Sequence, residues 1–233
     1  MTAWLQGSKL DGGKWIQKMT FSPDIYRRAV ANYDRTWRAT DETLYDLCRR
    51  HPGHSAIAGV NAKLWIIGRT YATGIERKIR SKRTQGSSMS QLGQYMLART
   101  AELDAIFGPL TDIAEPITPD KLRTIIGLHG RFVRLLQPLT RNAQSTRSFC
   151  SKYMHFHCPA VPIIDTYAER ALRKAVRWQR SFRLFDLPAG ADEQYARYVL
   201  RFWQLYQQAL AAGLQPTVKH LDYYLLCAAE GEA

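Results

Sequence analysis

The chain has 233 residues, 45% of them hydrophobic, and it carries a net charge of +13 with a pI near 9.8. A chain of this length can bury the core of one large domain or of two small lobes, which excludes a small scaffold that depends on disulfides or a metal for stability. No apolar run reaches the length of about 20 residues that a membrane-spanning helix needs, so we expect a cytoplasmic protein.

Helical periodicity extends along most of the chain. The spacing of apolar residues predicts helices over roughly 24–34, 41–50, 55–80 and 90–106, and then over roughly 122–136, 145–157, 166–177, 195–212 and 217–229. The helix over 166–177 places its apolar residues on one stripe and leaves Arg170, Arg173, Lys174 and Arg177 largely around the other side. No pair of strands is indicated, so the predicted fold class is all-α.

Three breaks divide this helical pattern. They are Gly86-Ser87-Ser88, the stretch over 108–119 with its three prolines, and Leu187-Pro188-Ala189-Gly190. We therefore expect two helical lobes that flank a cleft: an N-terminal lobe over 1–116, completed by 190–233, and a basic lobe over 117–189. The cleft is the expected place for a functional site.

The positive charge is concentrated in two segments. Between Lys121 and Arg180 twelve Lys/Arg stand against two acidic residues, a net charge of +10, and between Lys63 and Arg83 seven stand against one, a net charge of +6. The remainder of the chain therefore has a net charge of −3. This distribution favours a polyanionic partner whose phosphates are neutralised by the basic segments. The alternative is a solvated basic surface without such a partner.

Lys152 is the first of two candidate catalytic residues. It lies at the edge of an aromatic stripe formed by Phe149, Tyr153 and Phe156, where partial desolvation would leave more of its amine uncharged and nucleophilic. The alternative is a lysine that extends to solvent or binds a phosphate.

Asp165 is the second candidate, because it closes the apolar run Val161-Pro-Ile-Ile and opens the next helix. A carboxylate in this position is often only an N-cap. The two roles are compatible. If it faces a cleft, the same carboxylate could also activate water or stabilise positive charge that develops on a deoxyribose ring.

The segments around these two residues resemble a known family. Ser148-Phe-Cys-Ser-Lys-Tyr-Met-His-Phe-His157, followed by Pro162-Ile-Ile-Asp-Thr-Tyr167, is similar to the core of the helix-hairpin-helix DNA glycosylases, especially the small bacterial group similar to 8-oxoguanine glycosylases. Weaker similarity occurs at Lys63-Leu-Trp-Ile-Ile-Gly-Arg-Thr-Tyr-Ala-Thr73 and at Lys219-His-Leu-Asp-Tyr-Tyr-Leu-Leu226. The resemblance implies the glycosylase architecture, with Asp165 as the essential carboxylate and Lys152 as the amine that attacks the anomeric carbon.

Two positions differ from the family's pattern. Asn142-Ala-Gln-Ser145 stands where the family has a Gly-x-Gly hairpin turn, and the family's usual spacing back from Asp165 reaches Arg147 instead of Lys152. An arginine cannot form a Schiff base at neutral pH. If Arg147 holds the lysine's place, the enzyme leaves an abasic site, whereas an active Lys152 would add a weak strand-cleaving activity.

The resemblance also implies residues that contact DNA. The expected backbone contacts are the hydroxyl and basic side chains Ser145, Arg147, Ser148, Ser151, Arg170, Arg173 and Lys174. The expected base pocket is one wall of the first lobe, formed by Asn61, Trp65, Arg69 and Tyr71. Taken singly, each of these four is more often a core or surface residue, Trp65 above all.

No cofactor or metal is expected. His155, His157 and Cys158 follow one another at i, i+2 and i+3, and ligands so spaced do not converge from one regular helix. The four cysteines are too scattered for an iron–sulfur cluster or a disulfide framework. His129 lies on an apolar stripe and is interpreted as a core residue.

Together these features predict a monomeric DNA N-glycosylase that flips a modified base out of double-stranded DNA and excises it, associated with the nucleoid when bound. The substrate would be a hypermodified phage base such as glucosylated hydroxymethylcytosine, in antiphage defence, or 8-oxoguanine, in repair. The departures from the family's pattern slightly favour phage defence. The alternatives are a non-catalytic basic DNA-binding protein and a ribonuclease or RNA-binding toxin.

Overall fold

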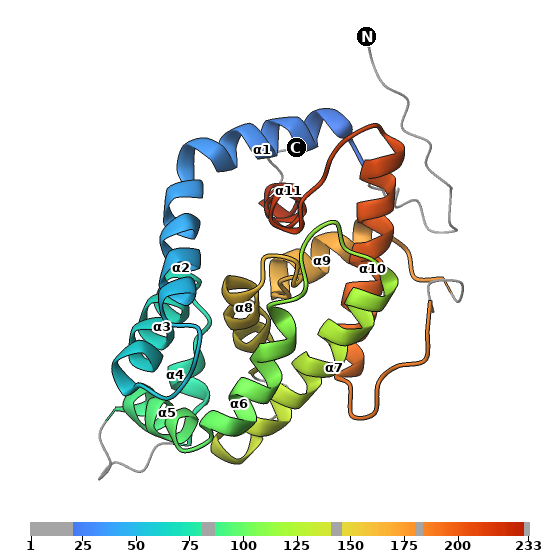
Figure 1. The fold of residues 1–233 in the computed structure, drawn as a ribbon. Helices are drawn as coiled ribbons and strands as arrows, with labels where there is room; N and C mark the ends of the chain where they lie inside the picture. Colours follow the sequence, from blue (N-terminus) through green and yellow to red (C-terminus); the bar gives the residue numbers. More distant parts are fainter. Residues whose placement is uncertain (1–20, 81–86, 141–145, 180–183, 231–233) are drawn as a thin grey trace, which may run out of the picture.

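The computed structural model describes residues 21–80, 87–140, 146–179 and 184–230. Within these ranges every regular element is a helix, and the only β-type pairing is an isolated bridge between Ile79 and Thr140. The prediction of an all-α fold is therefore confirmed (Figure 1).

The first half of the chain forms a succession of short and medium helices. They are α1 (Pro23–Thr36), α2 (Arg38–Arg50), α3 (Ile57–Thr70), α4 (Ile75–Lys78), α5 (Ser88–Leu97) and α6 (Thr100–Phe107), followed by the 3-10 turn η1 (Gly108–Leu110). The start of α1 is fixed by sequence chemistry, because the Ser22 side chain accepts a hydrogen bond from the Ile25 amide and Pro23 occupies the first turn.

The second half contains the longer helices. They are α7 (Pro119–Leu136), α8 (Arg147–His157), α9 (Thr166–Ala175), α10 (Glu193–Ala211) and α11 (Val218–Glu230), with the 3-10 turn η2 (Gln137–Leu139) after α7. Thr118, Asp165 and Asp192 cap α7, α9 and α10 with side-chain oxygens. Beyond α10 the chain turns at Gly213, whose φ of 74° is left-handed, which confirms the expected end of that helix.

Two predicted helices are wrong as single elements. The helix expected over 55–80 ends at Thr70, because Ala72 and Gly74 have positive φ angles of 45° and 62° that a right-handed helix cannot contain. The helix expected over 90–106 is two helices that meet at Ala98 and Arg99. In both cases the apolar pattern continues across a turn, so periodicity alone did not reveal the break.

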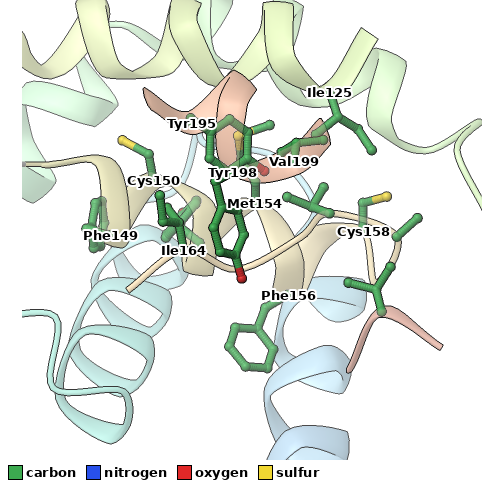
Figure 2. Packing of buried hydrophobic residues seen from close by; sticks show 14 of the residues in the cluster. Ile125, Phe149, Cys150, Met154, Phe156, Cys158, Ile164, Tyr195, Tyr198 and Val199 are labelled. Atoms are coloured by element: carbon green, nitrogen blue, oxygen red, sulfur yellow. The ribbon is translucent and has the colours of Figure 1, made fainter. Parts of the chain in front are cut away.

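Helix α8 lies in the middle of the molecule, with α2, α3 and α7 packed against it (Figure 1). Every residue from Phe149 to Phe156 is buried, as is typical of a helix surrounded by others. Figure 2 shows side chains of α8 and of the following link packed with Tyr195, Tyr198 and Val199 of α10. The segment with the candidate chemistry is thus held in the hydrophobic core.

One cluster of buried hydrophobic side chains extends through both of the expected lobes, from Leu44 and Leu64 to Phe132 and Leu172. Among the described helices, none has both the length and the apolar character required to cross a lipid bilayer.

Candidate active site at the start of α9

Two hydrogen bonds hold the second half of the link between α8 and α9, close to Asp165. The buried Ser151 side chain accepts a hydrogen bond from the amide of Ile164 at 3.1 Å. The Tyr195 hydroxyl donates to the carbonyl of Pro162 at 2.8 Å. These bonds satisfy backbone groups that would otherwise be buried without partners.

His155 also anchors this link. Its Nδ1 donates to the carbonyl of Val161 at 2.8 Å, since a carbonyl can only accept, and its Nε2 therefore accepts from the Tyr45 hydroxyl at 2.6 Å. Burial lowers the pKa of His155 to about 3, so the ring is neutral at physiological pH. His155 has a positioning role in the fold.

Asp165 has the capping role expected from its sequence position, and its second carboxylate oxygen lies close to Lys152. Its Oδ1 accepts a hydrogen bond from the amide of Ala168 at 2.9 Å, which caps α9. Its Oδ2 lies 3.3 Å from the Nζ of Lys152. The Asp165 side chain is 20% exposed and that of Lys152 is 7% exposed, so the pair lies at the boundary of the core.

The Lys152 amine is also bound by α3. Its Nζ donates to the carbonyl oxygen of Tyr71 at 3.2 Å and lies 5.8 Å from the centre of the Tyr71 ring. Tyr71 is the C-cap of α3. The structure therefore brings Tyr71, one of the expected pocket residues, to the Lys152–Asp165 pair.

A second charged cluster, which sequence reasoning missed, adjoins this pair. The Nζ of Lys219 lies 2.9 Å from the Tyr71 hydroxyl, 3.1 Å from Asp41 and 3.4 Å from Asp222. Asp41 also accepts hydrogen bonds from the hydroxyls of Tyr33 and Tyr71. Lys219 and Asp222 fall in the weak similarity at 219–226, which was the available signal, whereas no pattern indicated Asp41.

Asp222 is the most isolated carboxylate of this cluster. It is 2% exposed, and its Oδ1 has no hydrogen-bond partner among the described residues. Burial raises the pKa of Asp222 to about 6, against the opposing effect of Lys219, and the nearby charge of Asp165 raises it further.

Exposed aromatic rings lie near the pair. Trp37, at the junction of α1 and α2, is 38% exposed, and its ring centre lies 6.3 Å from that of Tyr71. Tyr167, two residues after Asp165, is 61% exposed. Rings of this kind can stack on an unpaired nucleobase. Neither residue was identified from the sequence.

Arg147 lies away from Asp165. Its guanidinium Nε binds both carboxylate oxygens of Asp192 at 2.9 and 2.8 Å, and its Nη1 donates to Gln194 at 3.0 Å. The Arg147 side chain is 11% exposed. Of the two candidates for the family's lysine position, Lys152 is therefore the one that contacts Asp165, and Arg147 joins α8 to α10.

The other expected DNA contacts fall into three groups. Ser145 lies outside the described residues, as does the rest of the expected hairpin position. Ser148 is half-buried, while Ser151 is fully buried and bonded within the link, a structural role that differs from the expected DNA contact. Arg170, Arg173 and Lys174 are exposed on α9, as their position on the helix predicted, and Arg173 pairs with Glu169 at 2.5 Å.

The remaining pocket residues make contacts on other sides of α3. Asn61 lies against Gly93 of α5. The guanidinium of Arg69 lies 4.8 Å from the ring centre of Trp65 and pairs with Glu76 at 2.9 Å. Among the described residues, Tyr71 is the one of these four that contacts Lys152.

The histidines and cysteine considered for a metal point to different neighbours. His157 lies 3.4 Å from the Nζ of the buried Lys63, and the thiol of Cys158 donates to the carbonyl of Ile113. His129 is buried, as interpreted, and its Nε2 donates to the carbonyl of Arg147 at 3.2 Å. Within the described ranges, no group of three or more histidine, cysteine or acidic side chains is arranged to hold a metal ion.

Comparison of the chain with protein-family models, with curated proteins and with solved structures gives no significant match.

Proposed function

We propose that this chain is a DNA N-glycosylase of the helix-hairpin-helix kind, which excises a modified base from double-stranded DNA with Asp165 as its catalytic carboxylate. The supporting observation is the 3.3 Å approach of the Lys152 amine to the Asp165 carboxylate at a partly exposed helix start. Both residues come from the motifs that resemble the family, although they are separated by a whole structured link.

Asp165 can support hydrolysis of the glycosidic bond. A water molecule attacks C1′ of the flipped nucleotide and transfers a proton to Asp165, while the C1′–N bond breaks and its electron pair leaves with the base. The leaving base takes up a proton. The negative charge of the carboxylate stabilises the positive charge that develops on the sugar ring.

Lys152 offers a second route from the same geometry. Its ammonium group first gives a proton to Asp165, and the free amine then forms the bond to C1′ as the base departs. Opening of the sugar ring gives a Schiff base, from which the strand can be cleaved. The hydrogen bond to the Tyr71 carbonyl holds the amine close to the carboxylate in either route.

The exposed face of α9 is the proposed contact with the DNA backbone. Arg170 and Lys174 are exposed on the helix that Asp165 caps, and Arg177 is exposed just beyond its end. Phosphates bound there would place a nucleotide near the start of the helix. The substrate is either a hypermodified phage base or 8-oxoguanine, and the protein would act in the cytoplasm on nucleoid or phage DNA.

Release of bases from DNA tests the proposal. The protein is incubated with 8-oxoguanine duplexes and with phage genomes that carry glucosylated hydroxymethylcytosine, and free bases are identified by mass spectrometry. The Asp165→Asn variant keeps a capping oxygen but loses the charge, so we expect base release to fall by about 100-fold or more. Asp120→Asn, at the exposed first turn of α7, is the matched control and should retain full release.

Borohydride trapping distinguishes the two routes. A covalent protein–DNA adduct that disappears in Lys152→Ala indicates attack by the amine, whereas retained base release without an adduct indicates hydrolysis. Salt-sensitive DNA binding without base release from any substrate would contradict the proposal and favour the non-catalytic DNA-binding protein. Activity on RNA that ignores base modification would favour the ribonuclease.

A further inference from the structure

A charged hollow of about 620 Å³ lies between the starts of α8 and α10 and the outer face of α9. Asp165 does not line it. The hollow is lined by four arginines, three carboxylates and one amide, namely Arg147, Arg173, Arg197, Arg201, Glu169, Asp192, Glu193 and Gln194. At neutral pH this lining has an excess of one positive charge.

Three of the arginines are paired within the hollow. The ion pairs are Arg147 with Asp192 at 2.8 Å, Arg173 with Glu169 at 2.5 Å, and Arg197 with Glu193 at 3.3 Å. The carboxylates of the lining are thus all engaged by arginines other than Arg201.

Arg201 is the arginine of the hollow without an ion pair to any described residue. Its Nε is buried and has no hydrogen-bond partner there. The guanidinium carbon lies 5.5 Å from the ring centre of Trp178, so the ring covers the cation without accepting a strong hydrogen bond. A buried N–H group without an acceptor lowers the stability of the fold unless a ligand supplies the acceptor.

Like charges gather around Arg201. Burial lowers the pKa of Arg201, and the positive charge of Arg173 lowers it further, against the opposing effect of Glu169. Arg197 adds to the repulsion. The guanidinium still stays charged at neutral pH, because arginine does not lose its proton in proteins. An anion placed between these side chains would relieve the repulsion.

We propose that this hollow binds a phosphodiester of the DNA backbone, with Arg201 as its principal ligand and Arg173 and Arg197 as additional donors. This proposal depends on the proposed function for its partner, DNA. A guanidinium fork matches two phosphate oxygens. The exposed pair of Arg197 with Glu193 is weak enough in water to exchange for a phosphate. The exposed Arg173 side chain can turn from the half-buried Glu169, which keeps two hydrogen bonds from Gln194.

The hollow lies at a useful distance from the candidate active site. Arg173 is two helical turns after Asp165, which corresponds to about 12 Å along the axis of α9. A DNA strand that ran along α9 would advance about 3.4 Å per nucleotide, which would put the bound phosphate about three or four positions from the flipped nucleotide. The hollow would thereby set the register of the strand.

Salt dependence of DNA binding tests this assignment. Binding of a fluorescently labelled duplex is measured by anisotropy at several salt concentrations for the wild type and for Arg201→Gln. Loss of one phosphate contact should weaken binding about tenfold and reduce the slope of log K against log salt by about 0.9. Arg28→Gln, an exposed arginine of α1, removes the same charge elsewhere and should leave the slope unchanged.

Three further measurements complete the test. Circular dichroism establishes that Arg201→Gln is folded, and Arg201→Lys, which keeps the charge but loses the fork, should weaken binding while it retains most of the slope. The proposal is overturned if the slope of log K against log salt for Arg201→Gln equals that of the wild type. It is also overturned if Arg201→Gln loses no more DNA affinity than Arg28→Gln. Inorganic phosphate that stabilises the wild type against heat without any change in DNA binding also overturns it, because the hollow would then hold free phosphate.

The failure of excision can be recognised separately. Base release is measured on the same preparations, and its absence together with the expected slope change would reject the glycosylase while the phosphate site stands.

Discussion

Tyr71 is the residue that connects the two charged clusters of the candidate site. Its carbonyl oxygen accepts a hydrogen bond from Lys152, and its hydroxyl contacts Lys219 and Asp41. Burial and the nearby carboxylate of Asp41 raise the pKa of Tyr71 well above its usual range, so the phenol remains protonated and continues to donate. The position of the Lys152 amine therefore depends on Tyr71, whose hydroxyl is held by Lys219 and Asp41.

Asp222 gives a prediction at this scale. Its pKa is raised from 3.8 to about 6 in the folded protein, so folding favours the protonated form. The stability from this group is fully present below about pH 4 and is lost as the pH rises through 6, a loss of about 3 kcal/mol at most. Asp222→Asn lacks this titration, so its stability relative to the wild type should increase between about pH 4 and pH 7.

Urea unfolding of both proteins across this range measures the difference. Other titrating groups are common to the two proteins and largely cancel. A difference in the free energy of unfolding that does not change with pH would contradict the assignment of the raised pKa to Asp222.

The break between α3 and α4 is the element that delivers Tyr71 to the site. The chain leaves the helix at Tyr71, passes through Ala72 with φ 45° and reaches Gly74 with φ 62° before α4 begins. Had the helix continued, as its apolar pattern suggested, the Tyr71 carbonyl would bond within the helix and would not be available to Lys152. The turn therefore creates an acceptor for the amine.

Gly74→Ala tests the conformational demand of this turn. A side chain at φ 62° should lower the free energy of unfolding by about 1–2 kcal/mol, because the left-handed region crowds a Cβ atom. The nearest side-chain atom to the new Cβ is Arg77 Nη2 at 3.1 Å, a flexible group that can move, so backbone strain dominates. Denaturant titration measures the change.

The matched control is Gly53→Ala, where no atom lies within 4 Å of the added Cβ and φ is not left-handed. Its stability should stay within about 0.5 kcal/mol of the wild type. Equal losses for the two variants would argue against strain at Gly74.

The molecule as a whole buries several neutral histidines under its basic surface. Burial lowers the pKa values of His54 and His129 to about 4 and that of His155 to about 3, and the pKa of His157 also lies well below its usual range. These rings link distant elements, such as His155 between α2 and the α8–α9 link. Protonation of any of them places a charge in the core, and among the described residues only that of His54 would face a bonded carboxylate, Asp104.

These buried neutral histidines predict that acid destabilises the protein. Because the folded pKa values are lowered, the stabilisation is present above about pH 6.5 and is lost as the pH falls. Between about pH 6 and pH 4 protonation of each buried imidazole should lower the free energy of unfolding by about 1.4 kcal/mol per pH unit. The sum over these histidines outweighs the opposite effect of Asp222. Denaturant titration over this range measures the slope.

His129→Phe provides the variant for this experiment. A phenyl ring can keep the stack with Tyr195, whose ring centre lies 3.6 Å away, although it gives up the hydrogen bond to Arg147. The slope of the free energy of unfolding against pH should decrease by the contribution of one proton, about 1.4 kcal/mol per pH unit. Stability that stays constant or increases on acidification of the wild type would show that these histidines are not buried in the neutral form.

The helices themselves were determined by local sequence. Thr118, Asp165 and Asp192 each cap the helix that follows, and the apolar stripe of α9 is buried while its arginines are exposed. Caps and periodicity act over a few residues, so they can be recognised without the fold. The turn after α3 was missed because the apolar pattern continues through it and only the backbone angles interrupt the helix.

The contacts of the candidate site were decided by tertiary structure. The sequence allowed either Lys152 or Arg147 beside Asp165, and the packing of α8 against α10 gives Arg147 to Asp192 and leaves Lys152 for Asp165. The cluster of Asp41, Lys219 and Asp222 joins helices from opposite ends of the chain. Charges so far apart in sequence meet only when the hydrophobic faces of their helices have been buried together, and no local pattern encodes that meeting.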